Sequence, residues 1–247
     1  KNIIEKINRV NVFYDEPKFF YYIASINYPK KDHNGRQSNS YNIFAGGASF
    51  ISNFLALLRC LGECVERFSL HCPKNKRIIP TNFLSIHENA LDPSIYINNS
   101  LIKKARFGWV EGYNFTKKTK CLIPAQLIYL DYEGDDKVQL TTRISTGASA
   151  GLTHETTLLR GIYEVVERDA LMTIYLNKIA ATRIELKSIK NKTIQLIFNS
   201  LKRYNLEWFL FDITNDLNIP SFLTILVDKT RLGPAITVGT KSSFNIK

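Results

Sequence analysis

Cysteine is scarce in this sequence, with four residues among 247, namely Cys60, Cys64, Cys72 and Cys121. No Cys-x-x-Cys pair is followed by a second pair, so the spacing does not favour a zinc site. Cys60 and Cys64 lie four residues apart within an apolar helical pattern, which is typical of small buried hydrophobic side chains. Because no disulfide framework is indicated, the sequence favours a reducing compartment.

Long apolar runs are absent too. No segment reaches the roughly 20 residues that a membrane-spanning helix needs, and the first residues, KNIIEKINRV, do not resemble a signal peptide. We therefore expect a cytoplasmic protein without a membrane partner. The formal net charge is +11, but the lysines are scattered and no platform of aromatic and basic residues stands out. We therefore expect a solvated, lysine-rich surface and no nucleic-acid partner.

Familiar nucleotide-binding and hydrolase motifs are also missing. The sequence has no Gly-x-Gly-x-x-Gly fingerprint and no nucleophile elbow for Ser-His-Asp chemistry. The stretch VGTKSS at 238–243 does not have P-loop spacing, because Thr240 separates Gly239 from Lys241. These absences argue against P-loop and Rossmann sites, and they leave the catalytic residue unknown.

The hydrophobic pattern predicts long helices connected by strands. Helices are expected over about 51–70, 153–178 and 188–204, with Thr153 as the N-cap of the second and Glu155 in its first turn. Strands are expected at these places: two within 9–27, then FGWVEGYNF, CLIPAQLIYLDYE, EWFLFDI, SFLTILV and PAITVG. Because strands and helices alternate irregularly, the pattern indicates a mixed α/β (α+β) architecture rather than a Rossmann fold.

One segment occurs twice. LLRCLGECVERFSL at 57–70 and LLRGIYEVVERDAL at 158–171 share the Leu-Leu-Arg start, both glutamates, one Val, the Arg and the last Leu. Each copy follows a glycine-rich segment, FAGGAS or ISTGASAG, which we expect to be a loop before the helix. Such an internal repeat indicates two pseudo-symmetric halves that present equivalent helices to a shared site.

The Glu-x-x-Glu spacing places two carboxylates on one face of each helix, Glu63 with Glu66 and Glu164 with Glu167. In apolar surroundings such carboxylates either pair with neighbouring arginines or hold a cation. A single copy would favour the ion pairs. Two matched copies favour Mg²⁺, which prefers oxygen ligands and usually brings a phosphate. Free backbone N–H groups in the glycine-rich segments and at the helix N-termini would suit that phosphate.

These residues resemble the YcaO family. ISTGASAGLTHETTLLRGIYEVVERDALMTIYL is similar to its core signature, and GGASFISNFLALLRCLGECVERFS is similar to its earlier helix. ERDALM, IPAQLIYL and FDITNDLNIPSF look most like the SagD-like branch, which forms azolines in peptides. The resemblance covers most of the chain from about Phe44, and we expect one YcaO-like domain over 1–247, truncated at its C-terminus relative to the family.

The resemblance implies a YcaO-like fold in which pseudo-symmetric halves, with mixed sheets packed against long helices, line a site for ATP and Mg²⁺. The four paired glutamates would hold the metal. Seven residues would contact the nucleotide: Glu63, Glu66, Arg67, Glu155, Glu164, Glu167 and Arg168. Three positions depart from the family pattern, because Arg59, Leu152 and Thr156 stand where many members have Ser, Asn and Glu.

The implied activity is that of an ATP-dependent cyclodehydratase. It would convert Cys, Ser or Thr residues of a ribosomally made precursor peptide to thiazolines or oxazolines, by phosphorylating the backbone amide oxygen. The resemblance also implies an E1-like, leader-peptide-binding partner protein, and a homodimer stays open. Two alternatives remain: thioamide or amidine formation with the same ATP site, and a non-catalytic subunit that docks a peptide or a partner.

Overall fold

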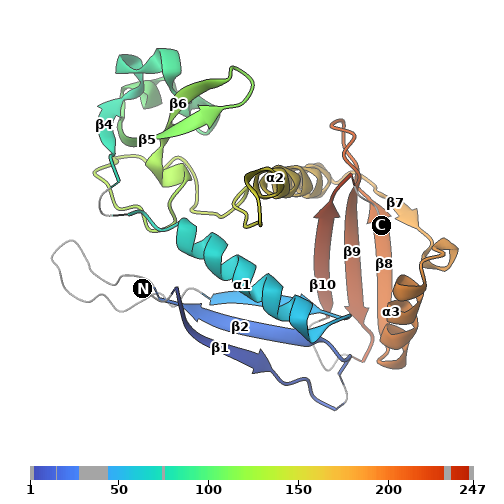
Figure 1. Cartoon of the computed structure of the whole chain (residues 1–247). Helices are drawn as coiled ribbons and strands as arrows, with labels where there is room; N and C mark the ends of the chain where they lie inside the picture. The colour runs from blue at the N-terminus through green and yellow to red at the C-terminus, as the bar shows by residue number, and fades with distance from the viewer. Residues whose placement is uncertain (1–2, 15, 28–43, 74–75, 231–234, 245–247) are drawn as a thin grey trace. The chain divides into compact units, whose positions relative to one another are not determined.

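The structure is a computed structural model, and it describes residues 3–14, 16–27, 44–73, 76–230 and 235–244 (Figure 1). The strands and long helices follow in the order β1 (Ile4–Val10), β2 (Phe20–Ile26), β3 (Phe44–Ser49), α1 (Asn53–Ser69), β4 (Ile79–Asn82), β5 (Arg106–Asn114), β6 (Thr119–Pro124), α2 (His154–Asn177), β7 (Thr182–Ile184), α3 (Lys192–Arg203), β8 (Leu206–Asp212), β9 (Ser221–Asp228) and β10 (Ile236–Ser242). Short 3₁₀ helices connect some of them: Phe83–Ser85, His87–Asn89, Pro93–Ile95, Ser100–Lys104, Ala125–Leu127 and Leu186–Ser188. No helix among these residues is long and apolar enough to span a bilayer.

The described residues form two compact units. The first contains those within Lys1–Asn27, Tyr41–Val65 and Thr146–Lys247, and the second contains those within Glu66–Ser145. Along the chain, α1 begins in the first unit and its last residues belong to the second. The expected single YcaO-like domain over 1–247 stays a prediction.

In the first unit, β1, β2 and β3 form an antiparallel sheet that packs against α1. The contact is close because the side chains are small: Ala45 on β3 and Ala56 and Cys60 on α1 are almost completely buried. Gly47 brings the backbones closest, since a Cβ at this position would collide with the backbone of Ala56 and Cys60. Only glycine allows the strand to approach the helix this closely.

The first unit also contains a second layer, in which β10, β9, β8 and β7 form an antiparallel sheet in that order. Helix α2 packs on β9 and β10, and α3 packs on β8. The core between α2 and this sheet is apolar: Ala170, Ile213 and Leu223 are buried and Ile174 and Ile225 pack against them. Burial of this α2 stripe, rather than helix propensity, provides most of the helix's stability.

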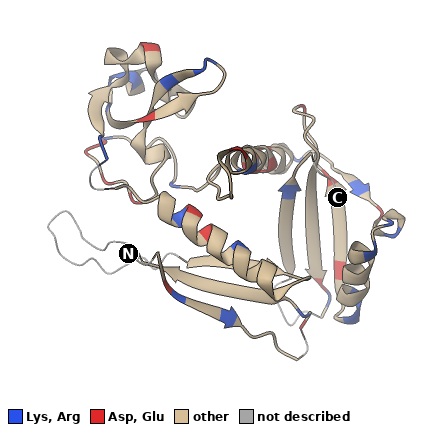
Figure 2. Ribbon diagram, viewed as in Figure 1, with Lys and Arg blue, Asp and Glu red and all other residues tan. Residues whose placement is uncertain are grey.

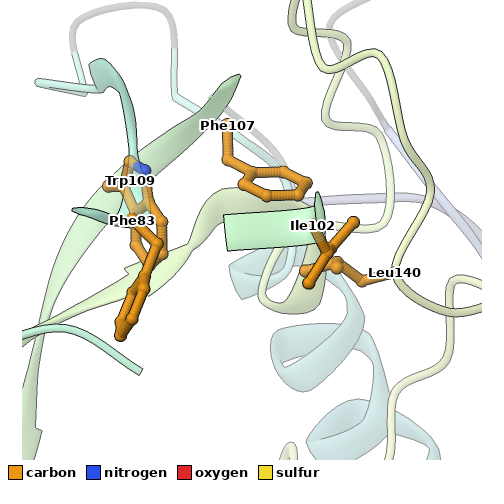
Figure 3. Packing of buried hydrophobic residues seen from close by; sticks show 5 residues of the cluster. All are labelled: Phe83, Ile102, Phe107, Trp109 and Leu140. Carbon is orange, nitrogen blue, oxygen red and sulfur yellow. The ribbon is translucent and has the colours of Figure 1, made fainter. Parts of the chain in front are cut away.

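The second unit is organised around the antiparallel sheet β4–β5–β6. Five buried side chains form its core (Figure 3): Phe83, Ile102, Phe107, Trp109 and Leu140. The rings of Phe107 and Trp109 meet edge to face with centroids 6.1 Å apart. Each such buried aromatic side chain contributes about 1.5–3 kcal/mol to stability, so this unit has a core of its own.

Most of the predicted elements are confirmed, including both repeat helices and the last three strands. The expected strand CLIPAQLIYLDYE is wrong beyond Pro124, where the chain turns into a 3₁₀ helix. Helix α3 begins at Lys192, later than expected, because the Asn191 side chain accepts hydrogen bonds from the N–H groups of Thr193 and Ile194 and caps it there. The mixed α/β class is confirmed. Within the described residues the sheets are antiparallel rather than mixed, because every pair between named strands is antiparallel.

Candidate functional site

The first glutamate of each repeat copy holds the glycine-rich segment that precedes its helix. The Gly46 N–H donates to Glu63 Oε2 at 2.9 Å. In the second copy the Gly147 N–H donates to Glu164 Oε2 at 3.1 Å. Both bonds join residues 17 positions apart, so the repeat found in the sequence is also a repeat of backbone contacts.

An arginine one turn before each of these glutamates completes the contact. Arg59 Nη1 donates to the Ala48 carbonyl oxygen at 2.5 Å, and Arg160 Nη1 donates to the Ala150 carbonyl oxygen at 2.8 Å. Each helix therefore holds its segment at one N–H and one C=O, with an arginine and a glutamate four residues apart. Arg59, a departure from the family pattern, thus has the same structural role as Arg160.

The contacts around the second copy include an ion pair. The other oxygen of Glu164, Oε1, accepts from Arg168 Nε at 3.2 Å and from Nη2 at 3.0 Å. Figure 2 shows acidic and basic residues together along α2. The ion pair weighed as an alternative to a cation site is therefore present for Glu164, while the same carboxylate also holds the glycine-rich loop.

Glu167 is the most shielded of the second pair, with 15% of its side chain exposed. Its Oε1 accepts a hydrogen bond of 2.7 Å from the Thr240 hydroxyl on β10. Lys241 Nζ lies 3.9 Å from its Oε2. Sequence reasoning missed both partners, because residues 73 positions apart meet only through the packing of α2 on β10.

Glu155, predicted to contact the nucleotide, lies in the first turn of α2 and is exposed. Hydrogen bonds from its own backbone N–H and from the Thr153 hydroxyl lower the pKa of its carboxyl group. Thr156, another departure from the family pattern, forms a capping box with Thr153, while Leu152 is fully exposed. The helix start is therefore built by local capping groups.

Glu66 and Arg67 lie in the last turn of α1, among the residues of the second unit. The Glu66 carbonyl accepts a hydrogen bond of 2.7 Å from the Ser69 hydroxyl. That bond closes the C-terminal turn of α1. Contact of Glu66 and Arg67 with a nucleotide stays a prediction.

The glutamates provide only oxygen donors, the ligand type that Mg²⁺ prefers. Within the described ranges, no three His, Cys, Asp or Glu side chains are grouped closely enough to hold a metal ion. Mg²⁺ usually binds one or two carboxylates and completes its shell with phosphate oxygens and water. The donor set therefore fits a metal that arrives with a nucleotide, and the assignment of all four glutamates as metal ligands stays a prediction.

A family model decides the classification. The model described as YcaO cyclodehydratase, ATP- and Mg²⁺-binding, matches residues 52–246. The chain belongs to the YcaO family. Membership of the SagD-like branch stays a prediction.

Two curated relatives match this YcaO chain over part of their lengths. It is 27% identical over 122 residues to an uncharacterized protein in the tfuA 3′ region of Rhizobium leguminosarum bv. trifolii, covering 48% of this chain and 29% of the relative. It is 23% identical over 150 residues to an uncharacterized protein of Methanothermobacter thermautotrophicus, covering 60% and 39%. The matches thus span less than half the length of either relative.

Solved structures share the fold at low sequence identity. A heterocyclase in complex with substrate and cofactor matches with a TM-score of 0.80 and 19% identity, over 98% of this chain and 35% of that one. YcaO from Methanopyrus kandleri, bound with AMPPCP and Mg²⁺, matches with 0.67 and 18%, over 97% and 57%. The microcin synthetase McbBCD complex of E. coli matches with 0.70 and 18%, over 96% and 58%.

Proposed function

We propose that this YcaO chain binds ATP with Mg²⁺ and modifies the backbone of a precursor peptide, forming thiazolines or oxazolines from Cys, Ser or Thr. The observation that carries the proposal is a pair of equivalent hydrogen bonds, in which Glu63 and Glu164 of the two repeat helices bind the glycine-rich segments that precede them. The family description, which names a cyclodehydratase that binds ATP and Mg²⁺, supports it. So does a related YcaO structure that contains AMPPCP and Mg²⁺.

In this proposal the glutamates divide the work. Glu63 and Glu164 order the glycine-rich segments by accepting hydrogen bonds from the Gly46 and Gly147 N–H groups. These two carboxylates, with Glu66 and Glu167, supply the oxygens that would hold Mg²⁺. Arg168 would contact the phosphates. Arg67 and Glu155 are the other proposed nucleotide contacts. Mg²⁺ would neutralise the phosphate charge, which is the main requirement of phosphoryl transfer.

The proposed reaction removes one water from the peptide for each ATP that is hydrolysed to ADP and phosphate. The Cys, Ser or Thr side chain loses its proton and forms a bond to the preceding amide carbon. The former carbonyl oxygen takes the γ-phosphoryl group and leaves as phosphate. The amide nitrogen loses its proton and forms the C=N bond of the ring. The chain's part in this sequence is to orient the two reactants and to exclude water.

The proposal includes a partner protein that binds the leader of the precursor peptide and presents its core. Support comes from the E. coli microcin synthetase, a complex of several proteins that was also solved with pro-MccB17 bound. We also place the reaction in the cytoplasm, where ATP is available and where the four free cysteines of this chain remain reduced.

The test is to incubate the purified chain and its candidate partner with the precursor peptide encoded beside its gene, ATP and Mg²⁺, and to measure peptide mass and ADP. Loss of water from the peptide supports azoline formation. Replacement of oxygen by sulfur would instead indicate a thioamide. If neither peptide mass nor ADP changes, the chain is a docking subunit and the proposal is wrong.

A site variant sharpens this test. Glu167→Gln keeps the size of the side chain but removes its charge, so we expect ATP turnover to fall about 100-fold or more. Glu111→Gln is the matched control, because Glu111 is an exposed carboxylate on β5 that pairs with Lys120. The control should turn over ATP like the parent protein, and an unchanged Glu167→Gln rate would contradict the metal-ligand assignment.

A further inference from the structure

The strand β10 contains most of the stretch VGTKSS, which lacks P-loop spacing, and its Thr240 contacts the candidate site. VGTKSS lies in an antiparallel strand in which Gly239 is paired with Thr224 and Thr240 with Leu223. The stretch is therefore a strand and not a phosphate-binding loop, which agrees with the spacing argument against a P-loop. Because β10 packs on α2, its side chains nevertheless approach the second Glu-x-x-Glu-Arg copy.

Thr240 fixes one oxygen of Glu167. Its hydroxyl lies 2.7 Å from Oε1, and the Glu167 side chain is only 15% exposed. A carboxylate so shielded from water needs donors, and a donor on one oxygen fixes the orientation of the other. Oε2 is the oxygen that Thr240 leaves available, and Lys241 Nζ lies 3.9 Å from it.

The residues that follow Thr240 hold this part of β10 in place. After Thr240, Ser242 is completely buried and its hydroxyl is 2.6 Å from the equally buried Ser221 hydroxyl. Further on, the Phe244 N–H donates to the Tyr163 hydroxyl at 3.3 Å. Tyr163 lies one turn before Glu167 on α2, so the same face of the helix is contacted twice by this end of β10.

Lys241 is differently placed. Its side chain is 74% exposed, and its distance to Glu167 is at the limit of an ion pair. A pair with so exposed a lysine contributes little, because water solvates the ammonium group and the long side chain keeps its freedom. The ammonium can therefore exchange the carboxylate for a nearby anion, and Lys suits phosphate as a mobile point charge.

We propose that Thr240 is a positioning residue for Glu167, and that Lys241 is a phosphate-binding residue of the same site. The inference rests on the proposed function, in which Glu167 holds the Mg²⁺ that accompanies ATP. Thr240 keeps the carboxylate turned so that Oε2 faces the metal. Lys241 moves its ammonium from Glu167 to a phosphate oxygen when the nucleotide binds.

The test measures binding rather than turnover. The purified full chain is titrated calorimetrically with ATP at several Mg²⁺ concentrations and with ATP in EDTA, and its unfolding temperature is recorded without nucleotide. Thr240→Val removes the hydroxyl but keeps the shape, whereas Thr240→Ser keeps the hydroxyl. Thr237→Val is the matched control, because Thr237 is an exposed threonine of the same strand.

We expect Thr240→Val to weaken Mg²⁺-ATP binding about tenfold, the effect of one lost charge-assisted hydrogen bond. It should raise the Mg²⁺ concentration needed for half-maximal binding and leave binding of ATP in EDTA unchanged. Thr240→Ser and Thr237→Val should stay within about twofold of the parent. Lys241→Met should weaken ATP binding about threefold to tenfold with or without Mg²⁺, because it removes the positive charge that would attract the phosphate.

The outcomes separate this inference from the proposed function. If the parent chain does not bind Mg²⁺-ATP even with its partner and peptide, the proposed function is wrong and the inference falls with it. If the parent binds and Thr240→Val binds equally well, or Thr240→Ser fails to restore binding, only the role of Thr240 is wrong. If the Thr240 variants do not fold, Lys241→Met still tests the site, because Lys241 is largely exposed and its replacement should not affect folding. Unchanged ATP binding by Lys241→Met would overturn the role of Lys241.

Discussion

The two copies of the Glu-x-x-Glu-Arg helix make the same contacts to segments of different structure. Before α1 the segment FAGGAS is strand β3, because β2 lies beside it and pairs with it. Before α2 the segment is a loop, as expected, with Gly147 at a φ of 86°. The helix sequence therefore sets the contacts at Glu63 and Glu164, whereas a neighbouring strand decides whether the held segment extends.

The copies also differ in where glycine allows the close approach. In the first copy it is Gly47 on the strand, opposite Cys60. In the second it is Gly161 on the helix, at the position equivalent to Cys60, where a Cβ would lie 2.6 Å from the Gly147 carbonyl oxygen. The distance between helix and segment is thus the common feature, and either side can supply the missing side chain.

A third difference is the space beside each helix. Cys64 is completely buried, whereas the equivalent Val165 is 48% exposed. Val165 instead lines a groove together with Gly147, Ser149 and Leu158. The next equivalent pair shows the opposite, with Val65 51% exposed and Val166 buried, so the two helices expose different positions of the repeat.

The largest effect is expected at the closest approach. Gly47→Ala should lower the free energy of unfolding by about 3 kcal/mol, because the new Cβ forces β3 away from α1. Gly62→Ala, on α1, is the control: nothing lies within 4 Å of its Cβ position, so we expect a gain of about 0.5–1 kcal/mol. Urea unfolding measures both, and equal stabilities would show that the close approach is not required.

The next largest effect concerns the first glutamates. Glu63→Ala and Glu164→Ala should each cost about 2 kcal/mol, because each leaves a backbone N–H without its charged acceptor. The Gln variants keep an acceptor and should recover about half of this. Amide hydrogen exchange gives the local readout: Gly46 should exchange faster only in Glu63→Ala, and Gly147 only in Glu164→Ala. Equal acceleration at both sites would contradict two separate contacts.

A smaller effect is expected at the arginines. Arg59→Met and Arg160→Met should each lower the free energy of unfolding by about 1 kcal/mol, because both side chains are exposed and water can replace part of the lost hydrogen bond. Arg203→Met, at an exposed arginine of α3, should stay within about 0.5 kcal/mol. If Arg59→Met behaves like this control, the first copy is held by Glu63 alone.

The smallest effect is the contribution of thiol ionisation to stability, which is expected for the buried Cys64 of the first copy and appears only above neutral pH. Burial raises the pKa of Cys64 from 9.0 to about 11. As the pH rises, the unfolded chain therefore loses this proton before the folded chain does, and that favours unfolding. The stability difference between the parent and Cys64→Ala should be constant below pH 9 and shrink between pH 9 and 11. Val165 has no proton to lose, so Val165→Ala should show no such dependence.

The sequence alone determined the two repeat helices, the Thr153 cap of α2 and the repeat itself, because these depend on residues within a few turns of each other. The periodicity placed α1 and α2 to within about two residues, and Thr153 and Glu155 marked the start of α2 as found. The matched glutamates also led to the family that the chain belongs to.

Only the tertiary structure decided which atoms these side chains contact. The Gly46 and Gly147 N–H groups, the ion pair of Glu164 with Arg168, and Thr240 beside Glu167 all depend on how a helix packs on its neighbours. Likewise FAGGAS became a strand because β2 was available to pair with it. A pattern of residues carries local preferences, but a carboxylate takes as its partner whichever donor packing brings within reach, and that donor can lie 73 positions away.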